Sequence, residues 1–126
     1  MFTYEQSTGR LFDDNGMLVL KGYAGRGPGL NNPEMQNVPK IGPLPCGYFT
    51  IGELQAHHPV LGANVMPLIP DPDNEMFNRS DFYLHGDNEE MNHTASEGCI
   101  VAGPDRLLVA HSSDKRLHVV PGPGVS

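Results

Sequence analysis

Glycine and proline are the residues that most constrain how this chain can fold. The sequence contains 15 glycines and 12 prolines among 126 residues, well above the average usage of about 7% and 5%. Glycine weakens a helix and proline interrupts one, whereas both are favoured in turns. We therefore expect many turns and few long helices. The length suits one domain with its own core, so we treat residues 1–126 as a single domain.

Short runs of aromatic and β-branched residues, bounded by turn residues, predict the strands. Asp14-Asn15-Gly16 indicates a hairpin, because Asn-Gly accepts the positive φ that a type I′ turn requires. Residues 65–70 contain two prolines, and we expect an edge strand there. The predicted strands are residues 2–5, 10–12, 17–20, 47–52, 65–70, 82–85, 100–101 and 117–120.

The remaining segments predict turns, loops and one helix. Residues 22–45 read as a long loop, and their Gly-rich part is no phosphate loop, since no helix pattern follows it. Residues 54–64 are ambiguous, with Pro59 against a helix, and residues 71–80 and 121–126 read as loop and tail. Residues 105–111 form the one convincing helix, with Pro104 near its first turn. The fold class is therefore mainly β with one short C-terminal helix.

Charge and hydropathy argue against two classes of partner. The formal net charge is -7, and the only adjacent cations are Lys115-Arg116, so nucleic-acid binding is disfavoured. No apolar run approaches the roughly 20 residues of a membrane span. The first residues, Met1 to Gln6, lack the basic and apolar regions of a signal peptide. We expect synthesis in the cytoplasm and, for action elsewhere, transport by another machine.

A histidine and a cysteine, each beside a glycine, carry the candidate chemistry. They lie in two segments, Phe82-Tyr83-Leu84-His85-Gly86 and Ser96-Glu97-Gly98-Cys99-Ile100. A thiol with its free pKa of about 8.5 is only a few per cent thiolate at neutral pH, and a nearby imidazole can take its proton. The pattern predicts Cys99 as nucleophile and His85 as general base. A Cys99 activated in this way would react at mildly acidic pH.

The residues around this pair predict the support for it. Gly98 has no side chain, so the backbone there can approach a substrate, and the N–H groups of Gly98 and Cys99 are candidate oxyanion donors. Gly86 flanks the histidine. Ser96, Asp87 or a backbone carbonyl would orient the imidazole, and the sequence does not choose among them.

Other residues with possible chemistry have simpler readings or offer alternatives. Cys46 reads as a small core or strand residue, and a Cys46–Cys99 disulfide would block catalysis. His57-His58-Pro59 reads as an exposed loop. The runner-up chemistry is a zinc-dependent peptidase, in which three side chains and a water hold the metal. Its candidate ligands are His85, Asp87 and His93.

Three stretches together resemble the L,D-transpeptidase (YkuD-type) catalytic domain. The first is His-Gly, a loop, and Ser-x-Gly-Cys-Ile. The second, residues 42–51, is similar to the family's Gly-Pro-x-Pro-x-Gly-x-Tyr/Phe strand. The third resembles a small bacterial subgroup that includes type VI secretion L,D-transpeptidase effectors; it is Gly27-x-Gly29-x-Asn31-Asn32-Pro33 with Gln36-Asn37-Val38-Pro39. The resemblance covers roughly residues 16–120.

The resemblance implies a β-sandwich-like domain whose Cys99 attacks the L-to-D bond of a peptidoglycan tetrapeptide stem. D-alanine leaves and a thioester forms, which water, a D-amino acid or a second stem amine resolves, with no metal or cofactor. Arg79 would bind a stem carboxylate, and Tyr83 lies beside the motif. Glu97 and Val101 stand where typical members have histidine and a polar residue. These two departures weigh against cross-linking more than against thioester chemistry, and they fit a toxin that trims or exchanges stems at least as well as a cell-wall builder.

The resemblance also implies partners and a place of action. An effector of this kind is delivered by a secretion apparatus to the periplasm of a target cell, and it has an immunity protein and a secretion-system carrier. The alternative reading is a non-catalytic cell-wall binding module of the same fold, in which Glu97 and Val101 mark a lost active site. The reactivity of the Cys99 thiol distinguishes the two.

Overall fold

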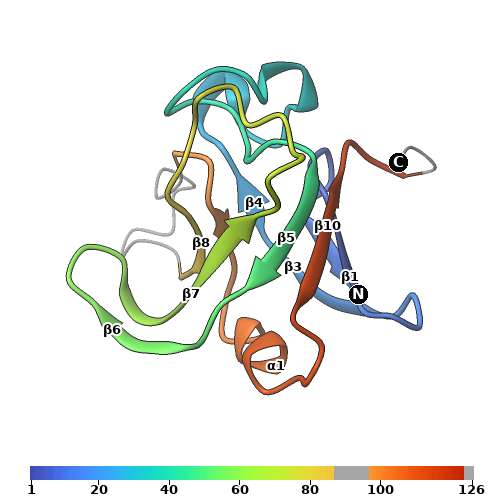
Figure 1. The fold of residues 1–126 in the computed structure, drawn as a ribbon, viewed down its shortest axis with the longest axis vertical. Coiled ribbons are helices and arrows are strands. Elements are labelled where there is room, and N and C mark those ends of the chain that lie inside the picture. Colours follow the sequence, from blue (N-terminus) through green and yellow to red (C-terminus); the bar gives the residue numbers. More distant parts are fainter. Residues whose placement is uncertain (87–96, 124–126) are drawn as a thin grey trace.

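The computed structural model describes residues 1–86 and 97–123 (Figure 1). Within these residues the chain is mainly β with one short helix, as predicted. The strands are β1 (Phe2–Glu5), β2 (Arg10–Phe12), β3 (Leu18–Lys21), β4 (Tyr23–Ala24), β5 (Gly47–Ile51), β6 (Gln55–His58), β7 (Gly62–Pro70), β8 (Phe82–His85), β9 (Ile100–Val101) and β10 (Arg116–Val120). Helix α1 spans Arg106–Ala110, and two 3-10 turns, η1 and η2, span Gly27–Gly29 and Pro33–Met35.

The strands form one sheet that nearly closes on itself. Their order is β3-β2-β1-β10-β5-β7-β8-β9-β4, and β6 pairs with β7 outside this path. The pairs β1–β10 and β8–β9 are parallel. β3 and β4 stand at the two ends of the order and are joined by Gly22 alone, so this residue links the opposite edges. A Cβ atom on Gly22 would lie 2.0 Å from the carbonyl oxygen of Val101, which explains the glycine.

The interior of this sheet holds one hydrophobic cluster. Alternate residues of β1 point inward, so Phe2 and Tyr4 are buried and their neighbours are half-buried. β8 and β9 contribute Phe82, Leu84 and Ile100 to the same cluster. These contacts fix the position of both strands that carry the candidate site.

β7 corrects the prediction of an edge strand. It pairs with β5 on one side and β8 on the other, so Leu68 lies opposite both Ile51 and Phe82. Pro67 is tolerated there because it lies beside the end of β5, where its carbonyl accepts from the N–H of Gly52 at 2.8 Å. The missing donor of the proline therefore breaks no hydrogen bond of the β5–β7 ladder.

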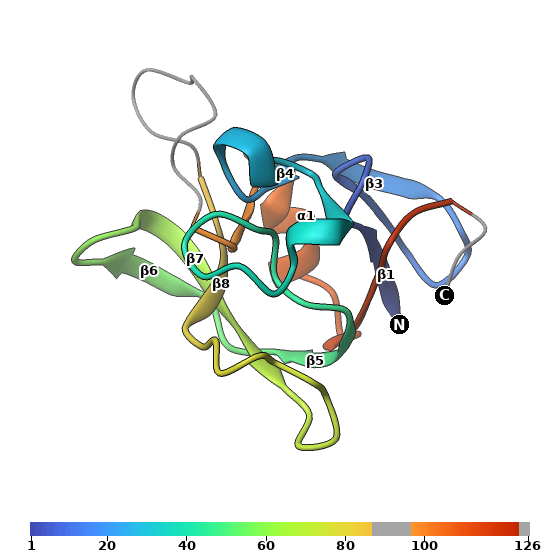
Figure 2. The same cartoon turned by 90° about the horizontal axis from the view of Figure 1, so that it is seen from above.

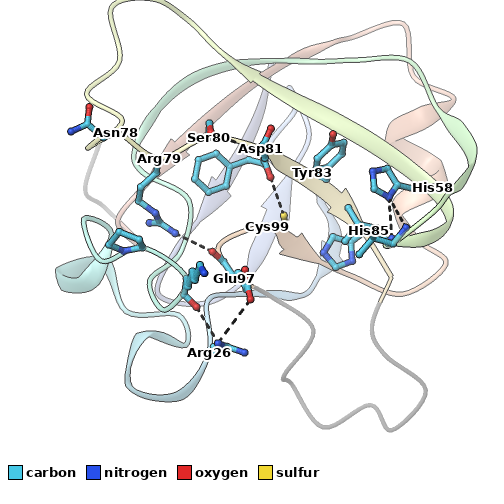
Figure 3. Close-up of a pocket in the computed structure, with 15 residues that line it drawn as sticks. Arg26, His58, Asn78, Arg79, Ser80, Asp81, Tyr83, His85, Glu97 and Cys99 are labelled. Carbon is cyan, nitrogen blue, oxygen red and sulfur yellow. Dashed lines mark hydrogen bonds and ion pairs between the residues drawn. The ribbon is translucent and has the colours of Figure 1, made fainter.

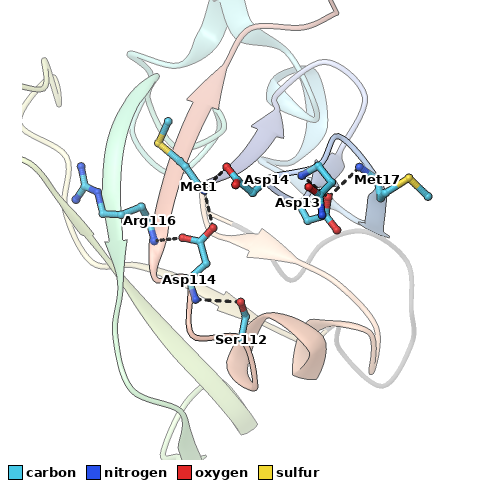
Figure 4. A network of polar contacts seen from close by, with 8 residues as sticks. Met1, Asp13, Asp14, Met17, Ser112, Asp114 and Arg116 are labelled. Atoms are coloured by element: carbon cyan, nitrogen blue, oxygen red, sulfur yellow. Dashed lines mark hydrogen bonds and ion pairs between the residues drawn. The ribbon is translucent and has the colours of Figure 1, made fainter.

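The first hairpin exists as predicted, but its turn is not type I′. Gly16 has a positive φ of 79° and Asn15 does not, whereas a type I′ turn requires both. The side chain of Asp13 instead accepts hydrogen bonds from the N–H groups of Asn15 and Met17, both at 2.9 Å (Figure 4). The loop is closed by this aspartate rather than by an Asn-Gly turn.

Polar contacts also fasten the start of β1 beside β10. The N-terminal amino group of Met1 donates to Asp14 at 3.0 Å and pairs with Asp114 (Figure 4). Asp114 in turn accepts from the N–H of Arg116 at 3.1 Å. The contact joins the first hairpin to the segment that leads into β10.

Two segments are more regular than the sequence predicts. The predicted loop 22–45 contains β4, η1 and η2, and the ambiguous residues 54–64 form β6 and the start of β7. The β6–β7 hairpin projects beside β8, as Figure 2 shows. No helix within the described ranges has the length and apolarity that crossing a membrane requires.

Candidate active site

The pairing of β8 with β9 brings the predicted histidine and cysteine to one face of the sheet. Leu84 pairs with Ile100 and His85 with Val101, in parallel. Because side chains alternate along a strand and paired residues share a face, the core-facing Leu84 and Ile100 place His85 and Cys99 on the opposite face. Their positions are offset by two residues across neighbouring strands, which is within reach of two side chains.

His85 is held in one ring orientation by its own neighbour. Its side chain is buried, with 2% exposure, and Nδ1 lies 2.7 Å from the carbonyl oxygen of Gly86. A carbonyl only accepts hydrogen bonds, so Nδ1 carries the proton and Nε2 is the basic nitrogen of the neutral ring. Of the three orienting groups considered from the sequence, the described residues supply the backbone carbonyl.

A pocket of about 750 Å³ opens over this face, within the size range of ligand sites. Figure 3 shows Cys99 in the middle of its lining, with His85 and His58 to one side and Arg79 to the other. All four residues predicted from the sequence as catalytic or substrate-binding contribute to it. The lining residues are Arg26, Pro39, Lys40, His58, Val60, Leu61, Asn78, Arg79, Ser80, Asp81, Phe82, Tyr83, His85, Glu97 and Cys99.

The Cys99 thiol is protonated at neutral pH in the unliganded protein. Burial raises its pKa to about 11, and the carboxylate of Glu97 acts in the same direction. Backbone hydrogen bonds and the Arg79 guanidinium offset this only in part. Sγ donates to the carbonyl oxygen of Asp81 at 3.7 Å. The environment therefore does not match the expectation of a thiol that reacts at mildly acidic pH.

Gly98 places the nucleophile in a conformation that other residues rarely adopt. Its φ is +132°, and a Cβ atom would lie 2.5 Å from Nη2 of Arg79 and 2.8 Å from Cε1 of Phe82. Its carbonyl accepts from the N–H of Leu44 at 2.8 Å. The glycine beside the cysteine is thus required by the backbone and by its neighbours.

Arg79 holds the backbone on one side of the pocket. Its side chain is 8% exposed. Nη1 donates to Gln36 O at 2.5 Å and Pro43 O at 2.7 Å, and Nη2 donates to Gly42 O at 2.9 Å and Glu97 O at 3.1 Å. These four bonds tie the residue 36–43 loop to the segment that carries Cys99. They give Arg79 a positioning role, and the carboxylate binding expected from the sequence stays a prediction.

Arg106 also binds backbone carbonyls, in this case those of β7 and of the residues that follow β9. Its guanidinium donates to the carbonyls of Ala63 and Asn64 in β7, both at 3.0 Å, and to Ala102 and Gly103. A Cβ atom on Gly86 would lie 3.1 Å from its Nη2. The arginine therefore fixes the β6–β7 hairpin against the residue that follows His85.

This hairpin brings His58 into the pocket. Nδ1 of His58 accepts from the N–H groups of Val60 and Leu61 at 3.1 and 3.0 Å, and the ring meets Tyr83 edge-on at 5.2 Å. The prediction of an exposed loop at 57–59 is therefore wrong for His58, which ends β6 and lines the pocket. Tyr83, whose ring contacts His58, lines the same pocket as Cys99 (Figure 3).

A family model described as the Tlde1 domain matches residues 19–122. The chain belongs to the Tlde1 domain family. This is a family of type VI secretion L,D-transpeptidase effectors. The match contains every pocket residue and agrees with the extent of the resemblance seen in the sequence. A comparison with curated proteins finds no significant match.

Within this Tlde1-family chain, some predicted residues can be placed and others cannot. Cys46 and Cys99 are both free thiols, and Cys46 donates to Gln6 Oε1 at 3.2 Å at a half-buried position before β5. Val101 is buried in β9 beside His85. Ser96, Asp87 and the zinc candidate His93 lie outside the described residues. Among the described residues, no three His, Cys, Asp or Glu side chains are grouped to hold a metal.

Arg26 and Lys40 are pocket residues that sequence reasoning missed. Arg26 lies in the Gly-rich run before η1, and its Nη2 is 3.9 Å from Glu97 Oε1. Lys40 is exposed and has a positive φ of 67°. Both come from the segment predicted as plain loop, more than 50 residues before Cys99 in the sequence, and no local pattern connects them to it.

Proposed function

We propose that this protein is a thiol enzyme that acts on peptidoglycan tetrapeptide stems, as an L,D-carboxypeptidase, a D-amino-acid exchange enzyme or both. One observation carries the proposal: Cys99 and His85 line one pocket of a Tlde1-family domain. The pocket is large enough for a peptide, and the Nδ1 bond of His85 to Gly86 O leaves Nε2 as the basic nitrogen of the ring.

The first half of the reaction forms a thioester. Nε2 of His85 takes the proton from Sγ of Cys99 as Sγ attacks the carbonyl carbon of the L-to-D bond, because a thiol of pKa about 11 is not a preformed thiolate. The oxyanion is stabilised by the N–H groups of Gly98 and Cys99. When the C–N bond breaks, the imidazolium returns its proton to the departing amine of D-alanine.

The second half of the reaction, in which the thioester is cleaved, determines the product. Water activated by His85 hydrolyses the thioester and leaves a tripeptide stem, whereas the amine of a free D-amino acid gives an exchanged tetrapeptide. Attack by a second stem amine would give a cross-link. Glu97 and Val101 provide no imidazole or polar donor beside the nucleophile for this third route, so trimming and exchange are the proposed outcomes.

We also propose a setting for this activity. The protein acts as an antibacterial toxin that a type VI secretion system delivers to the periplasm of a target cell, where the tetrapeptide stems are. The producing cell needs an immunity protein, and the secretion system needs a carrier for the toxin. A pull-down of the Cys99→Ala protein from the producing strain, with and without the neighbouring open reading frames, tests these partners.

The test of the activity is mass spectrometry of tetrapeptide muropeptides incubated with the protein, with and without D-methionine. Tripeptide formation supports L,D-carboxypeptidase action, and a D-methionine-containing tetrapeptide supports exchange. Cys99→Ala should abolish both. Cys46→Ala is the matched control, since it removes the other thiol and should leave both products. Turnover by purified Cys99→Ala would overturn the mechanism.

A non-catalytic binding module remains the second candidate, and one observation favours it. The raised pKa of Cys99 is typical of a buried, inert thiol. Under this alternative the wild-type protein and Cys99→Ala bind intact tetrapeptide muropeptides equally, and neither converts them. Release of D-alanine by the wild-type protein, and not by Cys99→Ala, would show that the protein is an enzyme.

A further inference from the structure

Three cations line the pocket, and they are not equivalent. Both terminal nitrogens of Arg79 are engaged by backbone carbonyls, and its side chain is almost fully buried. Arg26 is 40% exposed, and within the described part of the chain the exposed Lys40 ammonium forms no ion pair or hydrogen bond. An anion that enters the pocket therefore meets Arg26 and Lys40 before it meets any other positive charge of the lining.

Arg26 and Lys40 are built into one corner of the rim. Nε of Arg26 donates to the carbonyl of Lys40 at 3.2 Å, and the backbone N–H of Arg26 donates to Ile41 O at 2.8 Å. These bonds fix the guanidinium beside the residue 40–41 backbone. Its Nη2 faces Glu97 Oε1, and Figure 3 shows Arg26 below Glu97 in the lining of the pocket.

The present partner of Arg26 is a carboxylate of the chain itself. Glu97 Oε1 lies 3.9 Å from Nη2, at the outer limit of an ion pair, and Glu97 is 58% exposed. An exposed ion pair at this distance changes an equilibrium constant by a few-fold at most. Glu97 is therefore easily displaced. It lies two residues before Cys99, so a carboxylate that replaces it is held close to the nucleophile.

We propose that Arg26 and Lys40 form a subsite for a carboxylate of the substrate peptide, and that Glu97 occupies this subsite when no substrate is bound. The inference rests on the proposed function, because it names what recognises the stem at the same pocket. A tetrapeptide stem carries a C-terminal carboxylate and carboxylates on its acidic residues. A planar guanidinium binds such a group through two parallel hydrogen bonds, and the ammonium adds a second charge.

Steady-state kinetics of D-alanine release test this subsite. Arg26→Gln should raise KM about 10- to 100-fold and change kcat by less than about threefold, since a charge-assisted hydrogen bond to the substrate is lost. Lys40→Gln should raise KM less, and Arg26→Lys should recover part of the loss. Glu97→Gln should lower KM about two- to fivefold, because the internal competitor is removed. Arg10→Gln, an exposed arginine of β2, is the control.

A higher KM for Arg26→Gln together with a lower KM for Glu97→Gln distinguishes a substrate subsite from a structural ion pair. If Arg26 and Glu97 only stabilised the loop, both substitutions would shift KM in the same direction or leave it unchanged, and either result overturns the proposal. Thermal unfolding of each variant identifies any change that comes from partial unfolding.

Substrates with one carboxylate at a time converted to a carboxamide identify the group that is recognised. For the correct group, amidation raises the KM of the wild-type protein and abolishes the effect of Arg26→Gln. If all amidated substrates keep the full effect of Arg26→Gln, carboxylate recognition is wrong.

The two proposals fail in different ways. D-alanine release that is insensitive to Arg26 and Lys40 overturns the subsite and leaves the enzyme standing. No release by the wild-type protein overturns the proposed function. In that case calorimetric binding of the tetrapeptide to Cys99→Ala decides the subsite. A Kd at least about tenfold weaker with Arg26→Gln supports it, and an unchanged Kd overturns it.

Discussion

Nη2 of Arg79 packs so closely on Gly98 that a Cβ atom added to the glycine would lie 2.5 Å from it. The same nitrogen donates to the carbonyl of Glu97 at 3.1 Å. The guanidinium therefore covers the peptide just before Cys99, and a glycine is the one residue that fits beneath it. The shape of the backbone at the nucleophile depends on a buried arginine 20 positions earlier in the sequence.

Gly98→Ala should therefore damage both stability and activity. The substitution places a side chain at a φ of +132° and against Arg79, which should cost about 1–3 kcal/mol of unfolding free energy. Displacement of the Cys99 backbone should lower kcat by at least about 100-fold. Urea unfolding and D-alanine release measure the two effects. Gly103→Ala is the control, because nothing lies within 4 Å of its added Cβ. Equal behaviour of the two variants would contradict the argument.

Arg79→Lys should behave as a loss of positioning even though it keeps the charge. Lysine has no planar fork, so it cannot reach the four carbonyls that Arg79 joins, and the unsatisfied carbonyls should cost roughly 2–4 kcal/mol of unfolding free energy. We expect kcat to fall more than tenfold in protein that is still folded. Arg10→Lys, at an exposed position of β2, should be neutral in both assays. A kcat of Arg79→Lys equal to that of the wild-type protein would show that activity does not depend on the four bonds of Arg79 to backbone carbonyls.

The pKa of Cys99 gives a prediction for thiol reactivity. At pH 8 a thiol of pKa about 11 holds roughly 100-fold less thiolate than one at the ordinary value of 9.0, and its higher intrinsic nucleophilicity offsets only part of this. Alkylation by iodoacetamide should be about tenfold slower or more, and should still be accelerating above pH 10. Glu97→Gln should speed it, because the carboxylate raises this pKa. The Cys46→Ala background makes Cys99 the one reporting thiol. Rapid alkylation at pH 6 would contradict the prediction.

The raised pKa of Cys99 also makes the stability of the fold depend on pH. The pKa of Cys99 is higher in the folded protein than its ordinary value of 9.0, so the folded state binds this proton more tightly. The thiol therefore stabilises the fold fully below pH 9, and that contribution is lost as the pH rises toward 11. Cys99→Ala should remove this part of the alkaline destabilisation, which chemical denaturation between pH 8 and 11 measures.

The sequence predicted the parts of this fold that local patterns determine. β8, β9 and α1 follow from alternation, from turn residues and from Pro104, and His85 and Cys99 stand out because each is beside a glycine. β7 was mistaken for an edge strand because the cost of Pro67 depends on where β5 ends. That is a property of the partner strand, which no local pattern contains.

The rest of the site depends on long-range contacts. The residue 36–43 loop is held by Arg79, more than 35 positions later, and the β6–β7 hairpin by Arg106, more than 40 positions later. Lys40 lies in the first of these segments and His58 in the second, and Arg26 is bonded to the carbonyls of Lys40 and Ile41. Their residue types carry no signal of their own, so the sequence predicted the nucleophile and the base but not the walls around them.

His85→Asn provides the sharpest test of the base. The amide nitrogen of asparagine takes the place of Nδ1 and can still donate to Gly86 O, as Nδ1 does at 2.7 Å, but nothing replaces Nε2. The protein should remain folded while kcat falls about 100- to 10,000-fold, which is the usual contribution of general acid–base catalysis. His57→Asn, an exposed neighbour of His58 in β6, should leave kcat unchanged. Folded His85→Asn with wild-type turnover would remove His85 from the mechanism, and loss of folding in both variants would place the histidines in the structure alone.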